Sequence, residues 1–157
     1  MSGLQKFIVI IGRICLSFIF LLAAVNKLFD WNGFEDALTK ALTHSLDVYS
    51  GISWLHDGIA FFVPWASVLL LVGLVFELVG SLFLILGIKV RFGALLLILF
   101  LIPATFFFHA FWAFPEADRH QQMIDFLQNL SIFGGLLLVM AYGSSSPKSR
   151  ASGLAEG

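Results

Sequence analysis

Charged and polar side chains interrupt several long apolar segments of this 157-residue chain. A charged side chain at the centre of a membrane-spanning helix costs about 3 kcal/mol or more. Each such residue is therefore a candidate for an ion pair, a proton-exchange group or a ligand contact. The candidates are Arg13, Lys27, Glu77, Thr105, His109, Asp125 and Asn129.

Glu77 lies between Gly73 and Gly80, which together with Gly87 repeat every seven residues. Small residues at this spacing let helices approach closely, so Glu77 is expected to face another helix and not lipid. At a rise of about 1.5 Å per residue, Arg13 and Glu77 come within side-chain reach from the same end of their spans. This spacing predicts an intramembrane Arg13–Glu77 ion pair. Such a pair can be functional, or it can be a purely structural clamp between helices.

The other candidates are expected to form a polar cluster in the opposite half of the membrane. Lys27 ends the first span, and Thr105 precedes His109 by one turn late in the third. Asp125 and Asn129 share one helical face. Histidine exchanges protons near neutral pH, so the cluster predicts proton exchange or binding of a polar headgroup. As structural alternatives, Lys27 can reach the interface with its ammonium group, and Asp125 can stabilise a helix N-terminus.

The histidines and the single cysteine do not predict a metal or redox centre. His44, His56, His109 and His120 lack the pairwise spacing that arranges ligands on one helix. Cys15 is the only cysteine, so one chain can form neither a disulfide nor a CxxC motif. No metal site is therefore expected.

The composition identifies the elements that must position these side chains. Hydrophobic residues make up 59% and charged residues 12% of the chain, whereas soluble domains carry about 25% charged residues. Apolar runs long enough to cross a bilayer as helices occupy residues 7–25, 61–88, 92–114 and 124–142. We expect an all-α fold, a bundle of four transmembrane helices in a single membrane domain over residues 1–142.

An amphipathic helix is predicted between the first two spans. Residues 32–49 place apolar side chains at helical spacing and polar side chains elsewhere. This helix lies within a loop, residues 30–59, that is expected to be external. At the other terminus, residues 143–157 are rich in serine and glycine and are expected to form a disordered cytoplasmic tail.

The distribution of basic residues predicts the orientation, because cytoplasmic loops carry an excess of lysine and arginine. One side of the predicted bundle holds Lys6, Lys89, Arg91, Lys148 and Arg150. Both termini are therefore expected to be cytoplasmic, in a multi-pass protein of the cytoplasmic (inner) membrane. The net charge of −1 offers no basic surface for nucleic acid.

Several of these residues occur in motifs that resemble the DoxX family of small membrane proteins. The similar segments, between Arg13 and Met140, are Asn26-Lys27-Leu28, Glu77 with Gly80, Pro103-Ala104-Thr105, Phe108-His109 and Asn129-Leu130. The resemblance implies a four-helix membrane protein of a family named for a subunit of a terminal quinol oxidase. Some members are membrane anchors in complexes with thiol-redox or superoxide-detoxifying partners. The family pattern is carried here by Arg13, Lys27, Glu77, His109 and Asn129.

The resemblance and the polar residues together predict binding of a quinone-like or other lipidic ligand in the service of a membrane oxidoreductase complex. Membrane lipid and redox partner proteins are the expected partners, and no covalently bound cofactor is expected. His109 is the only histidine clearly within a span, whereas an oxidase centre needs several axial ligands. Catalysis by the chain itself thus stays open, as does the oligomeric state. The alternative is a non-catalytic membrane anchor or assembly scaffold.

Overall fold

The computed structural model describes residues 2–143, and these residues form an all-α structure, as the sequence predicts. Two 3₁₀ segments, Val63–Trp65 and Phe111–Ala113, lie beside the longer helices. The α-helices are α1 (Gly3–Phe29), α2 (Trp31–Val48), α3 (Ser53–Phe62), α4 (Ala66–Leu86), α5 (Val90–Phe108) and α6 (Glu116–Tyr142).

Four helical stretches are long and apolar enough to cross a membrane, which confirms the predicted fold class. They are Gly3–Phe29, Ser53–Leu86, Val90–Ala113 and Glu116–Tyr142. The second stretch joins α3, the first 3₁₀ segment and α4. Helix α2 lies between the first two stretches, within one residue of its predicted limits at each end.

The fourth span is longer than predicted, because α6 begins at Glu116 and not near residue 124. Pro115 precedes the helix with φ −55°, and Glu116 and Asp118 lie in its first turn. Acidic side chains there interact favourably with the helix dipole. Residues 116–123, which precede the predicted fourth span, are therefore helical as well. The expected disordered tail lies, apart from Gly143, outside the described residues.

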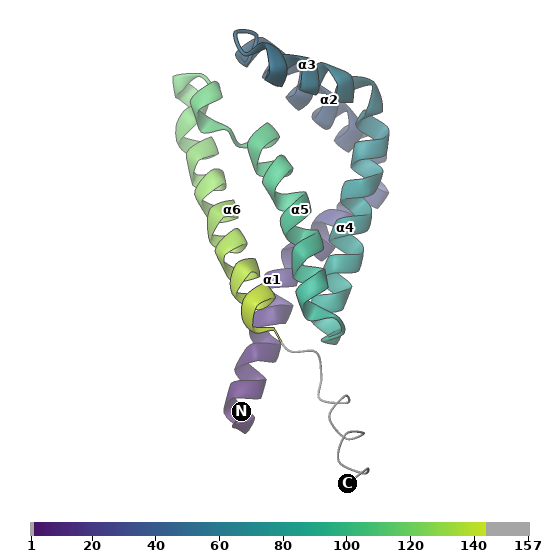
Figure 1. The fold of residues 1–157 in the computed structure, drawn as a ribbon, viewed down its shortest axis with the longest axis vertical. Helices are drawn as coiled ribbons and strands as arrows, with labels where there is room; N and C mark the ends of the chain where they lie inside the picture. Colours follow the sequence, from purple (N-terminus) through teal and green to yellow (C-terminus); the bar gives the residue numbers. More distant parts are fainter. Residues whose placement is uncertain (1, 144–157) are drawn as a thin grey trace.

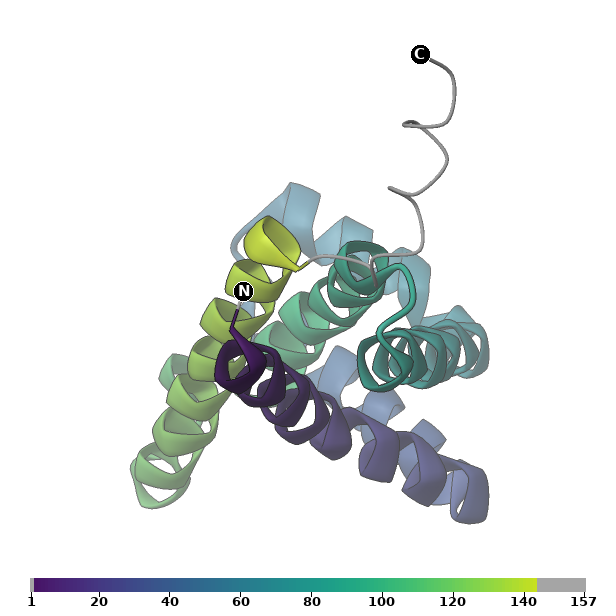
Figure 2. The same cartoon turned by 90° about the horizontal axis from the view of Figure 1, so that it is seen from below.

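The membrane helices lie close together near the N-terminus of α1 and diverge toward the opposite end, across which α2 and α3 lie (Figures 1 and 2). We call these the terminal end and the α2 end. Helix α4 packs against α1 and α5, and α5 packs against α6.

Glycine allows the closest contact in the bundle, which is between α4 and α5. A β-carbon on Gly80 would lie 2.7 Å from the Leu97 side chain and 3.0 Å from the Gly93 carbonyl oxygen. At the terminal end, α4 stops at Gly87, whose φ of +72° is readily adopted only by glycine. The predicted glycine stripe thus faces a neighbouring helix, and Glu77 beside it is buried.

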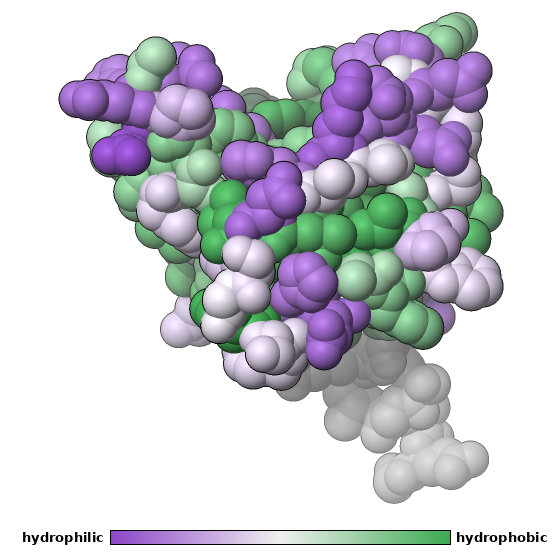
Figure 3. All heavy atoms as spheres, turned by 90° about the horizontal axis from the view of Figure 1, so that it is seen from above, coloured by the Kyte–Doolittle hydropathy of each residue, from purple (hydrophilic) through white to green (hydrophobic). Residues whose placement is uncertain are grey.

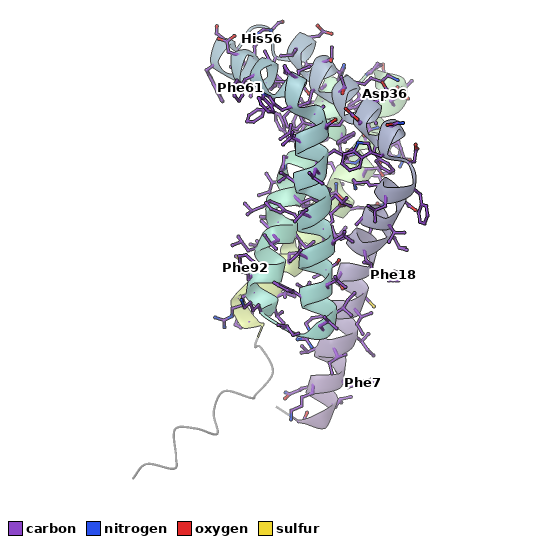
Figure 4. The ribbon with its side chains drawn as sticks, turned by 90° about the vertical axis from the view of Figure 1, so that its right-hand side faces the viewer. Phe7, Phe18, Asp36, His56, Phe61 and Phe92 are labelled. Carbon is purple, nitrogen blue, oxygen red and sulfur yellow. The ribbon has the colours of Figure 1, made fainter. Side chains whose placement is uncertain are left out.

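Large apolar side chains cover the outside of the bundle between its two polar ends. Phe7, Phe18 and Phe92 point outward from their helices, whereas Asp36 and His56 lie at the α2 end (Figure 4). Figure 3 looks onto the α2 end and shows hydrophilic residues gathered there, with hydrophobic residues exposed between them. This distribution suits helices that face hydrocarbon and ends that face water.

Candidate ligand-binding site

An ion pair between α1 and α4 is the most deeply buried charged contact in residues 2–143. The Lys27 Nζ atom lies 3.0 Å from Glu77 Oε1 and 2.9 Å from Glu77 Oε2. The Lys27 side chain is 10% exposed and that of Glu77 only 1%. Both charges are therefore removed from bulk solvent, and each depends on the other for compensation.

The predicted Arg13–Glu77 ion pair is wrong. The Arg13 guanidinium lies beside Gly87, where a β-carbon would be 3.3 Å from both of its terminal nitrogens. Glu77 precedes Gly87 by a distance of about 15 Å along α4, at about 1.5 Å per residue. Helix α1 runs antiparallel to α4 and extends beyond its C-terminal end (Figures 1 and 4), and Arg13 lies level with that end. A positive charge is favourable at that helix end.

A cavity of about 510 Å³ lies at the α2 end, between residues of α1, α2, α3, α4 and α5. Its wall is almost entirely apolar, with Gly73 and Ala104 providing space and Phe34, Phe100 and Phe107 providing aromatic faces. Among the described residues that line it, Lys27 is the one ionisable residue. The cavity thus combines a hydrophobic volume with a single ammonium group.

The ammonium group of Lys27 also lies over two aromatic rings of the cavity wall. Its Nζ atom is 5.2 Å from the centroid of Phe34 and 5.2 Å from that of Phe100. The negative faces of such rings attract a cation, most strongly where water is excluded. Lys27 is therefore held at the cavity wall by Glu77 on one side and by aromatic rings on others.

A second polar group forms where α5 meets α6. The His109 Nδ1 atom is 2.9 Å from Gln122 Oε1 and 3.9 Å from Asp125 Oδ2. Gln121 Nε2 donates to Asp125 Oδ1 at 3.0 Å. Gln122 also lines a smaller cavity of about 340 Å³, which shares Phe107 and Phe108 with the large one.

The prediction of one cluster in the wider half of the bundle is therefore wrong in its membership. His109 and Asp125 do lie together, but Lys27 makes its polar contacts with Glu77. The Thr105 hydroxyl donates to the Leu101 carbonyl oxygen of its own helix at 2.7 Å. Threonine in a helix satisfies its hydroxyl in this way, which removes it from the cluster. Asn129 is half-buried, and its side chain makes no hydrogen bond within residues 2–143.

The pairing of Lys27 with Glu77 was not predicted. The first span offers two cations to Glu77, and depth counted from the ends of the apolar runs favoured Arg13. The helical-face pattern does not separate the two, because Arg13 and Lys27 share one face with Ser17, Phe20 and Ala24. In the structure Lys27 is the buried one of the two cations. Within residues 2–143, no three histidine, cysteine or acidic side chains come together as metal ligands.

Comparison with known proteins agrees with the motifs in the sequence. The DoxX family model matches residues 8–110, more than half of the chain. Over 61 residues, 38% of this chain, the sequence is 38% identical to the Surfeit locus protein 4 homolog of Schizosaccharomyces pombe. That alignment spans only 20% of the length of this relative. No solved structure matches the chain. The DoxX match includes Lys27, Glu77 and the whole of α2 to α5, and the chain belongs to the DoxX family of multi-pass membrane proteins.

Proposed function

We propose that this protein binds a quinone-like or other lipidic ligand in the cavity at the α2 end. The observation that carries the proposal is an apolar cavity of about 510 Å³ with one ammonium group in its wall. Ligand pockets typically measure about 300–1,000 Å³ and combine apolar walls with a few polar groups that orient the ligand. The apolar part of the ligand packs against Phe100 and Phe107, and its polar head faces Lys27.

We also propose that the protein serves a membrane oxidoreductase complex. The similarity of its motifs to a family named for an oxidase subunit supports this part of the proposal. A bound quinol is oxidised to the quinone by a partner protein that takes two electrons, two protons are released, and this chain holds the ring. Lys27 donates a hydrogen bond to a ring oxygen, and the phenylalanine side chains keep water from the ring. In this role the chain is a binding subunit.

A membrane anchor or scaffold is the second candidate function, and the surface of α3 favours it. Trp54 is 77% exposed and Phe61 is 66% exposed on this short helix, which lies across the α2 end. Exposed aromatic side chains of this kind are common where a partner protein or the bilayer interface is contacted. An anchor predicts that changes on α3 disrupt complex assembly while changes in the cavity do not.

Binding of a benzoquinone with a decyl tail to the purified protein in lipid nanodiscs tests the proposal. Saturable binding beyond that of empty nanodiscs is expected for the wild type. Ala104→Trp fills the cavity and is expected to weaken binding by about tenfold or more. The matched control is Ala141→Trp, because Ala141 is exposed near the end of α6 and does not line the cavity. Equal affinities of the two variants would refute the site.

A further inference from the structure

The charge on Lys27 is already balanced within the protein. Both carboxylate oxygens of Glu77 lie within 3.0 Å of the ammonium nitrogen. Glu77 itself does not line the cavity and is 1% exposed, so it lies behind Lys27 as seen from the cavity. A ligand in the cavity therefore meets an ion pair with no net charge, and not a free cation.

Lys27 nevertheless retains a hydrogen-bond donor for a ligand. An ammonium group has three N–H bonds, and the two Glu77 oxygens accept at most two of them. No third oxygen acceptor is contributed by the described residues, and the remaining side of the group faces Phe34 and Phe100. Both rings line the cavity, so the donor that remains is available there.

We propose that the Lys27–Glu77 pair makes the cavity selective for an uncharged headgroup with an oxygen acceptor, such as a quinone, ketone or ester. This inference rests on the proposed binding function and specifies the chemical class of the ligand. An uncharged oxygen accepts the free N–H of Lys27 without changing the net charge of the site. Lys27 contacts the ligand, and Glu77 is a positioning residue that acts through Lys27.

An anionic headgroup, such as a carboxylate or a phosphate, is disfavoured by the same arrangement. It would place a second negative charge beside a cation that Glu77 has already neutralised. In a cavity with apolar walls, repulsion between two anions is only weakly screened. The site would then carry a net negative charge without a further cation among the described residues that line it.

A matched pair of probes isolates the headgroup charge. Methyl palmitate and palmitate share the same tail and a carbonyl group, and only the acid is charged at a pH at which it is fully ionised. Affinities are measured for the protein in nanodiscs of zwitterionic lipid and corrected for partitioning into empty nanodiscs. The wild type is expected to bind the ester about tenfold or more tightly than the acid.

The variant Glu77→Gln is expected to reverse this preference, because it leaves Lys27 as an uncompensated cation that attracts the acid. A purely structural role of Glu77 would lower both affinities together and leave their ratio unchanged, which would overturn the inference. The double variant Lys27→Met with Glu77→Gln removes both charges and avoids an unpaired buried cation. It is expected to bind the ester about tenfold more weakly than the wild type, because the N–H donor of Lys27 is lost, and unchanged affinity for the ester would contradict the role of that donor.

The outcomes for the wild type separate this inference from the function on which it rests. If neither probe nor the decyl benzoquinone binds saturably, the proposed function fails. If both palmitate probes bind equally well, the cavity does bind lipidic molecules but the selection by charge is wrong.

Discussion

Lys27 and Glu77 maintain opposite charges at a depth where water has little access. Burial of each charge is costly, and the cost is offset by the contact at 2.9–3.0 Å and by the rings of Phe34 and Phe100. The loss of one partner leaves the other charge without compensation. When both charges are removed by substitution, uncharged side chains of similar size take their place.

A double-mutant cycle tests this contact. Lys27→Met and Glu77→Gln should each lower the free energy of unfolding by about 3–5 kcal/mol, because each leaves a buried group without its partner. The double variant should lose clearly less than the sum of the two. Denaturant titration in detergent micelles, followed by circular dichroism, measures all four proteins.

A control double-mutant cycle combines Glu77 with Arg13 and not with Lys27. Arg13→Gln and Glu77→Gln should have additive effects, since Arg13 lies beside Gly87 at the other end of α4. Coupling in the Arg13 cycle together with additivity in the Lys27 cycle would contradict the arrangement described here.

His109 contacts Gln122 and Asp125 but does not line the large cavity. His109→Ala should therefore lower stability by about 0.5–1.5 kcal/mol, the typical value of one hydrogen bond. It should leave the affinity for the decyl benzoquinone within about twofold of the wild type, since the His109 side chain does not line the cavity. Quinone titration of the variant in nanodiscs checks this. A tenfold loss of quinone affinity would instead indicate that His109 belongs to the ligand site, as the sequence predicts.

The burial of Lys27 and Glu77 could be predicted from the sequence, but their pairing could not. An isolated charge in an apolar run indicates burial against protein, and this holds for Lys27 and Glu77. Which charges meet depends on the length and tilt of α1 and on the register between helices.

At the scale of elements, the contact between α4 and α5 depends on the absence of side chains at two positions. Gly80 and Gly93 let the two backbones approach each other, and Phe83, Leu84 and Leu97 close around them. This contact fixes α5 beside α4 and thereby holds Gly73 and Phe100 on the cavity wall. Close packing of small residues is a main source of helix association in membranes.

Gly80→Ala should lower the stability of the bundle by about 1–3 kcal/mol, because the new β-carbon overlaps Leu97 and forces the helices apart. Gly134→Ala in α6 is the matched control, since a β-carbon there would meet no neighbouring side chain within 4 Å. The control should be as stable as the wild type or more stable, because alanine favours helix more than glycine does. Thermal unfolding in detergent compares the two, and equal losses would argue against the tight contact.

The elements were more predictable than the contacts between them. Periodicity located α2 closely, since its apolar face repeats at helical spacing. Hydropathy missed the first two turns of α6, where Glu116 and Asp118 favour a helix N-terminus without being apolar. The outline of the cavity depends on tertiary packing, because residues from α1 to α5 that lie far apart in the sequence line it together.

At the scale of the whole molecule, the two ends of the bundle differ in charge and shape. Lys89 and Arg91 lie at the terminal end, beside the end of α4, whereas Lys40 lies on α2 at the other end. If the basic end is cytoplasmic, the cavity lies in the half of the membrane nearer the external side. A lipidic ligand and an external partner would then meet at α2 and α3.

Labelling with a membrane-impermeant maleimide in intact cells tests this orientation. In a Cys15→Ser background, Ser50→Cys lies in an exposed turn after α2 and should react. Gly3→Cys lies at the exposed start of α1 and should react only after the membrane is permeabilised. The reverse pattern would show that the orientation is inverted.

Native mass spectrometry of the protein extracted with its own membrane lipids tests most directly whether the cavity at the α2 end holds a ligand. The wild type and Ala141→Trp should each retain an uncharged lipidic molecule as an added mass that persists after the outer lipids are removed. Ala104→Trp should lack that mass while remaining folded. No retained molecule in the wild type, or the same occupancy in all three proteins, would contradict the assignment of the cavity as a binding site.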